Sequence, residues 1–315
     1  MIHVFVLNNY AGNKDRVGAI REYLASQKDM KYFIFNTLEA GSEFKVMWRV
    51  KKYFANEKIR VYACGGSGTF RNVVQGAGDD LTNMEFAFYP CGMSNDFLKA
   101  FPEGEAPFRS IDNLIDGKVV YLDYIRTNGG NCVNSASAGV DVAMSRYTEE
   151  NKSYAMINER LPYLIGTLKA AFLAKNKRFR VTVDGEVLED DFGEVFFANG
   201  PVLGANIKVA EDKNITDGRG SVILMARRSG IRVLPTLSML IKGDFESFKK
   251  QKNCYMKKFS KIKVEDLSGE GIAFNLDGEI LDAKETWDIE IVQKGLPFVL
   301  PKGMQYEAER GGNNE

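Results

Sequence analysis

The residues with the clearest chemical meaning form the run 63–69, Ala63-Cys64-Gly65-Gly66-Ser67-Gly68-Thr69, which follows the largely apolar stretch 59–62. Glycine has no Cβ atom, so backbone N–H groups in such a run can turn toward one point and bind a phosphate. A helix over 70–75 would direct its positive end to the same point. The same pattern also occurs as a tight turn between a strand and a helix, so both interpretations stay open.

A second run of small residues, Pro90-Cys91-Gly92-Met93-Ser94-Asn95-Asp96-Phe97, repeats the order of strand, small residues and helix start. Ligands of parallel sheets gather at the carboxyl ends of the strands, so the loops 8–13, 65–69 and 90–96 can converge on one ligand there. Asn95 or Asp96 can take part in such a site, or simply cap the helix that follows.

The segment Asn275–Glu279 places two carboxylates, Asp277 and Glu279, on either side of a glycine. Such a pair can polarise an acceptor hydroxyl and take its proton. An Asp-Gly pair between apolar strands is also a common hairpin turn. The chain contains the same triplet at 184–186, Asp184-Gly185-Glu186, so we expect at most one copy to be catalytic.

Two further polar segments allow a functional and a structural interpretation. Asp217 precedes a glycine and can ligate a cation through its carboxylate and nearby carbonyl groups, or lie in a plain turn. The lysine-rich segment 249–263 can meet anionic lipid headgroups. Its interleaved apolar residues are more typical of a strand with one solvated face and one core face, and we favour that interpretation.

The composition excludes several classes of function. The 42 basic and 42 acidic residues cancel, so net charge gives no reason to expect a nucleic-acid partner. The only histidine is His3; a Ser-His-Asp or Cys-His triad would have to use it, and metal sites with two histidines are excluded. Acid–base chemistry must therefore come from carboxylates, lysines or tyrosines.

The same composition predicts a cytoplasmic protein. Four widely separated cysteines, without a Cys-x-x-Cys pair, suit a reducing compartment. No apolar run approaches the ~20 residues that a membrane span needs. Residues 1–3 lead into a strand without the charge pattern of a signal peptide.

Two domains are expected from the length of 315 residues and from a change of pattern near residue 123. Residues 1–123 alternate short apolar strands with helical patterns, which predicts a parallel sheet with helices on both faces. The expected strands are 3–7, 32–36, 59–63 and 86–89, and the expected helices are 14–27, 43–55, 70–75 and 95–101.

Residues 124–293 contain short strand-like runs separated by turn signals, which predict an antiparallel β-sandwich. The runs are 178–183, 194–198, 220–225, 261–264, 271–276 and 287–292, and helical patterns interrupt them at 151–175 and 231–250. We expect the tail 294–310, which opens with a short apolar run, to complete the first domain.

In this order, the motifs resemble those of the diacylglycerol kinase catalytic family, in particular its small soluble bacterial lipid kinases, which are similar to sphingosine kinases and more distantly to NAD kinases. The run 65–69 is similar to the family signature Gly-Gly-Asp-Gly-Thr, and 90–97 to a segment usually ending Gly-Thr-Gly-Asn-Asp-Phe. The opening loop 8–12 is similar to Asn-Pro-x-Ser/Ala-Gly. The other motifs follow in family order over nearly the whole chain, at Thr37, 122–123, 137–141, 198–200, 217–218 and 276–279.

The resemblance implies an N-terminal doubly wound α/β domain, like those of phosphofructokinase and NAD kinase, and a C-terminal antiparallel β-sandwich domain for a lipid substrate. It implies transfer of the γ-phosphoryl group of ATP to a lipid hydroxyl, most readily that of diacylglycerol or a related lipid, with Mg²⁺ as a second cofactor. Glu279 is implied as the general base, oriented by Asp277. Asp96 and Asp123 are implied around the Mg²⁺ at the phosphates, and Asp217 at a second, structural Mg²⁺.

The nucleotide-binding residues that the resemblance implies are Asn8, Gly12, Thr37, Gly65, Gly66, Ser67, Gly68, Thr69, Asn72, Met93 and Asn95. The substrate class implies peripheral contact with the inner face of a membrane. A homodimer is left open.

Several positions depart from the family pattern, and most lie in the nucleotide loops. Ser67 replaces the signature aspartate, Arg71-Asn72 replace the usual Asn-Glu pair, and Met93-Ser94 replace Thr-Gly. Glu211 stands where the family often has proline. The loop changes remove two acidic groups and add a basic one, so a cation held by carboxylates should bind more weakly there.

Two hypotheses follow from these departures. The first is a working lipid kinase with an altered metal site; we prefer it because the other acidic motif residues are retained, namely Asp96, Asp123, Asp217, Asp277 and Glu279. The second is a catalytically impaired relative that binds nucleotide or lipid and acts through a partner.

Overall fold

The structure, a computed structural model, describes residues 1–9, 14–39, 41–92, 95–150, 177–203, 207–226, 234–252 and 254–306. The chain divides into two compact units. The first contains Met1–Tyr124, Asn214–Asp217 and the described part of Gln293–Glu315, and the second contains Ile125–Lys213 and Gly218–Val292. The division after residue 124 lies one residue from the predicted boundary. The inclusion of 214–217 in the first unit had no signal in the sequence.

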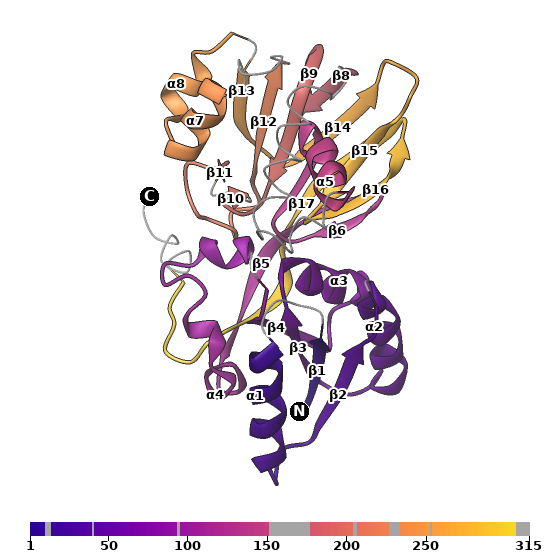
Figure 1. Ribbon diagram of the computed structural model, residues 1–315, viewed down its shortest axis with the longest axis vertical. Helices are drawn as coiled ribbons and strands as arrows, with labels where there is room; N and C mark the ends of the chain where they lie inside the picture. The colour runs from indigo at the N-terminus through magenta and orange to yellow at the C-terminus, as the bar shows by residue number, and fades with distance from the viewer. Residues whose placement is uncertain are drawn as a thin grey trace. The chain divides into compact units, whose positions relative to one another are not determined.

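A parallel sheet forms the centre of the first unit. Its strands are β1 (Ile2–Asn8), β2 (Tyr32–Thr37), β3 (Ile59–Gly65), β4 (Met84–Pro90) and the end of β17 (Thr286–Leu300), in the order β17-β4-β3-β1-β2. Every residue of β3 and β4 is buried, as expected for parallel strands that are covered on both faces. The covering helices include α1 (Lys14–Ser26), α2 (Ser42–Tyr53) and α3 (Ser67–Ala77), with α1 on the opposite side of the sheet from α2 and α3 (Figure 1).

An aromatic cluster fixes the elements next to β4. Phe298 of β17 lies opposite Phe86 of β4, and its ring centroid is 5.5 Å from those of Phe97 and Phe101. Phe70 of α3 stacks on Phe88 of β4 at 4.9 Å. Aromatic pairs at such distances add to the stability that burial of their area provides. One buried cluster therefore holds the helix after the first loop together with the segments before and after the second loop.

A buried ion pair lies at the other end of the sheet. Arg60 Nε and Nη2 lie 2.9 and 2.8 Å from Glu85 Oε2, and both residues are about 95% buried. Arg60 Nη1 also donates to the carbonyls of Leu114 and Ile115, at the end of α4 (Ile111–Ile115). Burial raises the pKa of Glu85, but the hydrogen bonds from Lys58 and Arg60 together lower it by more. The net shift of the pKa is therefore downward. The Glu85 carboxylate holds the Arg60 guanidinium, which in turn attaches the end of α4 to the sheet.

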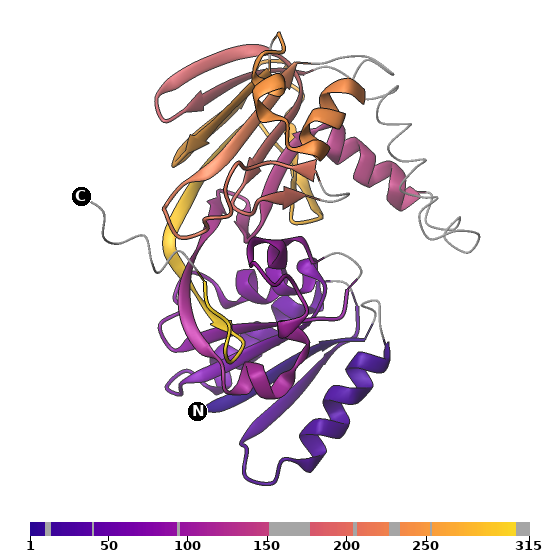
Figure 2. The same cartoon turned by 90° about the vertical axis from the view of Figure 1, so that its left-hand side faces the viewer.

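The second unit consists mainly of antiparallel strands (Figures 1 and 2). The pairing order is β16-β15-β7-β9-β8-β14-β17, while β12 pairs with β9 and β13, and β5 pairs with β6 and β17. Besides β17, these strands are β5 (Lys118–Thr127), β6 (Gly130–Cys132), β7 (Ser135–Gly139), β8 (Lys177–Val183), β9 (Glu186–Ala198), β12 (Gly220–Ala226), β13 (Cys254–Phe259), β14 (Lys261–Asp266), β15 (Ile272–Leu276) and β16 (Glu279–Lys284). Residues at alternate strand positions point into a buried core, in which Phe274 stacks with Phe197 at 5.9 Å and lies 4.4 Å from Trp287.

Three described helices belong to this unit: α5 (Val140–Glu150), α7 (Leu234–Lys242) and α8 (Phe245–Lys249). Leu240 and Phe248 of the last two pack with Ile223 and Met225 of β12 in a second buried cluster. A single helix was predicted over 231–250, but Gly243 has a φ of +77°, which ends α7 before α8 begins. The predicted helix over 151–175 lies outside the described residues.

The predicted fold class is confirmed, with an α/β first unit and a β-sandwich second unit. The predicted strand 194–198 is the second half of β9, whose first half contains charged residues that pair with β8. The apolar start of the tail, for which no strand was predicted, forms the end of β17 beside β4 in the first unit.

In the lysine-rich segment, strand β14 alternates between core-facing apolar residues and solvent-facing lysines, as in the interpretation that we favoured. Ile262 and Val264 of β14 are buried, and the lysines beside them are exposed. Most lysines of the segment face an acidic side chain within 3.0 Å, in the pairs Lys249–Glu211, Lys257–Glu186, Lys258–Asp212 and Lys263–Glu265. Lysine charges that are already paired with carboxylates give little attraction to anionic headgroups. Within the described ranges, no helix combines the length and apolar character needed to cross a membrane.

The single histidine predicts a distinctive pH dependence of stability. Burial, the nearby Arg60 guanidinium and the terminal ammonium group lower the pKa of His3 from 6.5 to about 4. Between these two pH values the unfolded chain binds a proton at His3 more strongly than the folded protein does. The free energy of unfolding should therefore fall as the pH drops from about 6.5 to about 4, and His3 should cause no further loss below pH 4.

Because no other histidine is present, the His3 ring gives the only imidazole NMR signal, and its chemical shift should titrate with a midpoint near 4 in the folded protein. The urea-unfolded chain serves as the control, with an ordinary midpoint. A folded-state midpoint near 6.5 would contradict the environment described for this ring.

Candidate functional site

The two glycine-containing loops of the first unit touch each other. The Gly65 carbonyl, at the end of β3, accepts hydrogen bonds from the N–H groups of Cys91 and Gly92 at 2.7 and 3.1 Å. A Cβ atom added to Gly92 would lie 2.5 Å from the Cα atom of Gly66. The expected convergence of these loops at the carboxyl ends of β3 and β4 is therefore observed.

The helix after the first loop begins inside the glycine run. Gly66 is the N-cap of α3, and Ser67, Gly68 and Thr69 form its first turn. The first N–H groups of a helix find no acceptor within that helix, and the helix dipole makes this end positive. The first turn contains no acidic residue. A Cβ atom at Gly68 would have no atom within 4 Å, so the backbone is open to a close approach there.

Side chains from β1 and α3 meet beside this turn. Asn8 Nδ2, at the end of β1, donates to Thr69 Oγ1 at 2.8 Å. The Thr69 side chain fills the space beside Gly65, where an added Cβ would lie 2.4 Å from its oxygen. Thr37 is buried, and its hydroxyl donates to the Leu7 carbonyl at 3.4 Å. The structure thus brings Asn8 and Thr69 together with the glycine loop.

Glu43, in the first turn of α2, joins this group although no sequence motif indicated it. Its side chain is almost fully buried. Oε1 accepts a hydrogen bond from Asn8 Nδ2 at 3.2 Å, and Oε2 accepts one from Asn72 Nδ2 at 3.5 Å. Arg71 Nη1 donates to Asn72 Oδ1 at 2.9 Å, and its guanidinium lies 5.9 Å from the centre of the Phe44 ring. At 2% exposure, Arg71 is built into the core rather than turned outward as a phosphate ligand.

The second loop contains two polar residues at its helical end, η1 (Asp96–Ala100). Asn95 is at the N-cap position but makes no capping bond through its side chain; its Nδ2 donates to Gly92 O and Glu105 Oε2 at 3.1 and 2.6 Å. The interpretation that the Asn95 side chain caps this helix is therefore wrong. Asp96 Oδ1 lies 2.7 Å from Lys99 Nζ. Gly12 and Met93, two of the expected nucleotide contacts, lie outside the described residues.

The other acidic residues expected at metal sites of the first unit have different environments. Asp123 is fully buried, and its Oδ1 accepts a hydrogen bond from the Lys294 N–H at 2.7 Å. Asp217 is exposed. Across the described part of the chain, no three His, Cys, Asp or Glu side chains form a group that could hold a metal ion by themselves. The metal roles of Asp96, Asp123 and Asp217 stay predictions.

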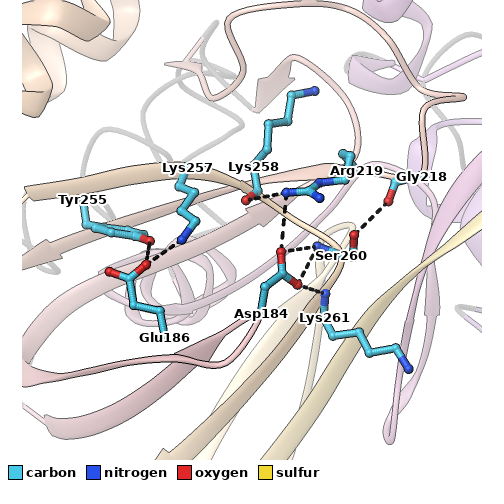
Figure 3. A network of polar contacts seen from close by, with 9 residues as sticks. All are labelled: Asp184, Glu186, Gly218, Arg219, Tyr255, Lys257, Lys258, Ser260 and Lys261. Atoms are coloured by element: carbon cyan, nitrogen blue, oxygen red, sulfur yellow. Dashed lines mark hydrogen bonds and ion pairs between the residues drawn. The ribbon is translucent and has the colours of Figure 1, made fainter.

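Both Asp-Gly-Glu triplets of the second unit are hairpin turns with the same backbone. Asp184 and Asp277 have φ values of +45° and +48°, and the following glycines have φ of +92° and +96°, as in type I′ turns. The Asp184 carboxylate accepts hydrogen bonds from the N–H groups of Ser260 and Lys261 (Figure 3). The Asp277 carboxylate accepts from the N–H groups of 133–135, at 2.6 to 3.3 Å. Each aspartate thus attaches its hairpin to a neighbouring loop.

The glutamates after the two turns differ in their surroundings. Glu186 Oε2 lies 2.5 Å from Lys257 Nζ and accepts a hydrogen bond from the Tyr255 hydroxyl at 3.2 Å (Figure 3). Glu279 is exposed at the start of β16, opposite Leu276 of β15. The catalytic role of Glu279, and the orienting role of Asp277 toward it, stay predictions.

Comparison with known proteins gives independent information on each unit. Residues 3–127 match the sequence profile described as "Diacylglycerol kinase catalytic domain". Residues 134–294 match the profile "YegS C-terminal NAD kinase beta sandwich-like domain". The two matches follow each other along the chain and correspond to its α/β and β-sandwich parts.

Individual relatives agree with these profiles. The protein named "Diacylglycerol kinase" from Bacillus subtilis (strain 168) is 24% identical over 220 residues, which cover 70% of each chain. A protein of Staphylococcus carnosus (strain TM300), named provisionally as a lipid kinase, is 23% identical over 52% of this chain and 53% of its own length. A crystal structure from Bacillus anthracis str. Sterne, titled provisionally as a diacylglycerol kinase, is similar in fold with a TM-score of 0.70 at 20% identity, covering 94% of this chain and 96% of that one.

The loop contact predicts the effect of a single methyl group. Gly92→Ala should destabilise the protein by roughly 1–3 kcal/mol, because its Cβ meets the Gly66 backbone, which has no side chain that can move away. Gly18→Ala in α1 is the matched control: its Cβ meets no atom within 4 Å, and alanine favours the helix. Chemical unfolding would measure both changes, and equal stability of the two variants would contradict the close contact of the loops.

Proposed function

We propose that this protein is an ATP-dependent lipid kinase, because the chain belongs to the family that joins a diacylglycerol kinase catalytic domain to a YegS-type C-terminal domain. In this proposal the γ-phosphoryl group of ATP passes to the hydroxyl of diacylglycerol or a related lipid. The names of the relatives support a lipid kinase, while the specific lipid belongs to the proposal.

The single observation that carries the nucleotide part is the joined pair of glycine-containing loops. The positive end of α3, the exposed backbone at Gly68 and the polar side chains of Asn8 and Thr69 occur together at the carboxyl ends of parallel strands. Helix N-termini with glycine at their start bind phosphate groups in many folds. Phosphoryl transfer depends mainly on such positioning and on charge neutralisation, so the lack of catalytic histidines is no obstacle.

Mg²⁺ fits the oxygen atoms that the second loop offers. Asn95 Oδ1 is a buried acceptor with no hydrogen-bond donor among the described residues. The Asp96 carboxylate follows it in the chain, and Mg²⁺ would take the place of the Lys99 ammonium that pairs with it. Mg²⁺ prefers oxygen ligands and usually keeps several waters, so one or two carboxylates together with the phosphates suffice. When bound, it would neutralise the charge that develops on the transferred phosphoryl group.

For the acceptor hydroxyl, we propose that Glu279 takes the proton as general base. Its carboxylate is exposed at the end of a hairpin whose position Asp277 fixes through three backbone N–H groups. A general base typically contributes a rate factor of about 10²–10⁴. The catalytically impaired relative remains the alternative, and Ser67, which leaves the first turn of α3 without an acid, is the observation in its favour.

A lipid kinase assay tests the proposal. Wild-type protein, radiolabelled ATP, Mg²⁺ and mixed vesicles containing diacylglycerol should give labelled phospholipid, and Glu279→Gln should lower the initial rate at least about 100-fold. Glu186→Gln, at the equivalent position of the other hairpin, is the matched control and should keep the wild-type rate. If wild-type protein gives no more label than Glu279→Gln across a panel of lipids, the kinase proposal is wrong; nucleotide binding would then favour the impaired relative.

The open backbone at Gly68 gives a test that separates binding from folding. Gly68→Ala should keep or raise thermal stability, because its Cβ meets no atom and alanine is favoured over glycine in a helix by ~0.5–1 kcal/mol. Its affinity for Mg-ATP, measured by calorimetry, should nevertheless fall, because the methyl group enters the space that a phosphate would occupy. Unchanged affinity would mean that the phosphates do not approach α3.

A further inference from the structure

Glu43 is a buried carboxylate that no expected motif explains. At 2% exposure the carboxylate is removed from water, so its ionised form costs several kcal/mol unless hydrogen-bond donors compensate. The side-chain amides of Asn8 and Asn72 donate to it, one to each carboxylate oxygen. Its place in the first turn of α2 adds the favourable field of a helix N-terminus. Glu43 therefore links the end of β1 and the start of α2 to the middle of α3.

The chemistry of these groups fixes the direction of a chain of hydrogen bonds. An ionised carboxylate can only accept, so the Asn8 group that faces Glu43 must be the NH₂ group. The same NH₂ group has a second hydrogen, which it donates to Thr69 Oγ1 at 2.8 Å. Because Thr69 Oγ1 is the acceptor in that bond, the hydroxyl hydrogen of Thr69 must point to another acceptor.

We propose that Glu43 is a positioning residue that makes Thr69 a hydrogen-bond donor to a phosphate group of the nucleotide. This inference rests on the proposed function, since it requires an anion at the start of α3. A neutral side chain at position 43 would allow the Asn8 amide to turn over, so that its carbonyl oxygen accepts the Thr69 hydrogen. The hydroxyl would then be occupied within the protein and lost to the phosphate.

The Asn72 contact follows the same logic. Its NH₂ group faces Glu43 Oε2, and its carbonyl oxygen accepts the hydrogen bond from Arg71 Nη1 at 2.9 Å. Both amides next to Glu43 thus present their donors to the carboxylate, which is the arrangement that an ionised Glu43 requires. Glu43 thus affects nucleotide binding only through Asn8 and Thr69 and does not itself contact the nucleotide.

A double-mutant cycle on Mg-ATP affinity tests this inference. Thr69→Val keeps the shape of the side chain and removes the hydroxyl, so Kd should rise about tenfold or more, as for loss of a hydrogen bond to a charged group. Glu43→Gln should raise Kd by a similar factor, because glutamine can also donate and no longer fixes the Asn8 amide. In the double variant the two losses should not multiply, because each removes the same donor.

Glu39→Gln is the matched control for removal of a negative charge near α2. Glu39 is exposed and paired with Lys45 at 2.9 Å, so its replacement should leave Kd unchanged. Thr69→Ser restores a hydroxyl and should retain wild-type affinity. If Glu43→Gln does not fold, as judged by its thermal melt, the contrast between Thr69→Val and Thr69→Ser still decides whether the hydroxyl is the donor.

The outcomes separate this inference from the proposed function. If wild-type protein binds no nucleotide, the proposed function is wrong, and this inference loses the premise on which it rests. Wild-type binding with losses that multiply in the double variant would overturn the inference alone, because Glu43 and Thr69 would then act separately. Equal affinity of Thr69→Val and Thr69→Ser would also overturn it.

Discussion

The contact between the backbones of Gly66 and Gly92 is the constraint on which the candidate site depends. The Gly65 carbonyl accepts hydrogen bonds from N–H groups of the second loop, and the Gly66 Cα atom leaves no room for a side chain at Gly92. This contact is possible only because β3 and β4 are adjacent parallel strands that end at the same edge. The aromatic cluster around Phe298 then holds α3, which follows the first loop, against the segment that follows the second loop.

Local sequence patterns predicted the parts of the fold that local forces determine. The strands of the first unit were found because both of their faces are buried, which leaves a continuous apolar run. The first half of β9 was missed because its charged residues are partly exposed and are held in place by pairing with β8. Glu43 could not be found either: in the sequence it resembles any solvated acid in a first turn, and its partners Asn8 and Asn72 are 35 and 29 positions away.

The two Asp-Gly-Glu hairpins show why a short motif gives limited information about chemistry. Their turns have the same backbone, and in both the aspartate binds backbone N–H groups of a neighbouring loop. The presence of the triplet is thus explained by structure alone. Any difference in function must come from the glutamate that follows: Glu186 is held by Lys257 and Tyr255, whereas Glu279 is exposed beside a loop that Asp277 organises.

The last strand has a consequence for the way in which the protein is made. β17 ends beside β4, and Phe298 lies at the centre of the aromatic cluster of a unit whose other strands come from the beginning of the chain. During synthesis on the ribosome, the first hundred residues therefore emerge with one edge of β4 and a large apolar surface uncovered. They must wait, in contact with solvent or a chaperone, until the end of β17, almost two hundred residues further along the chain, has been translated.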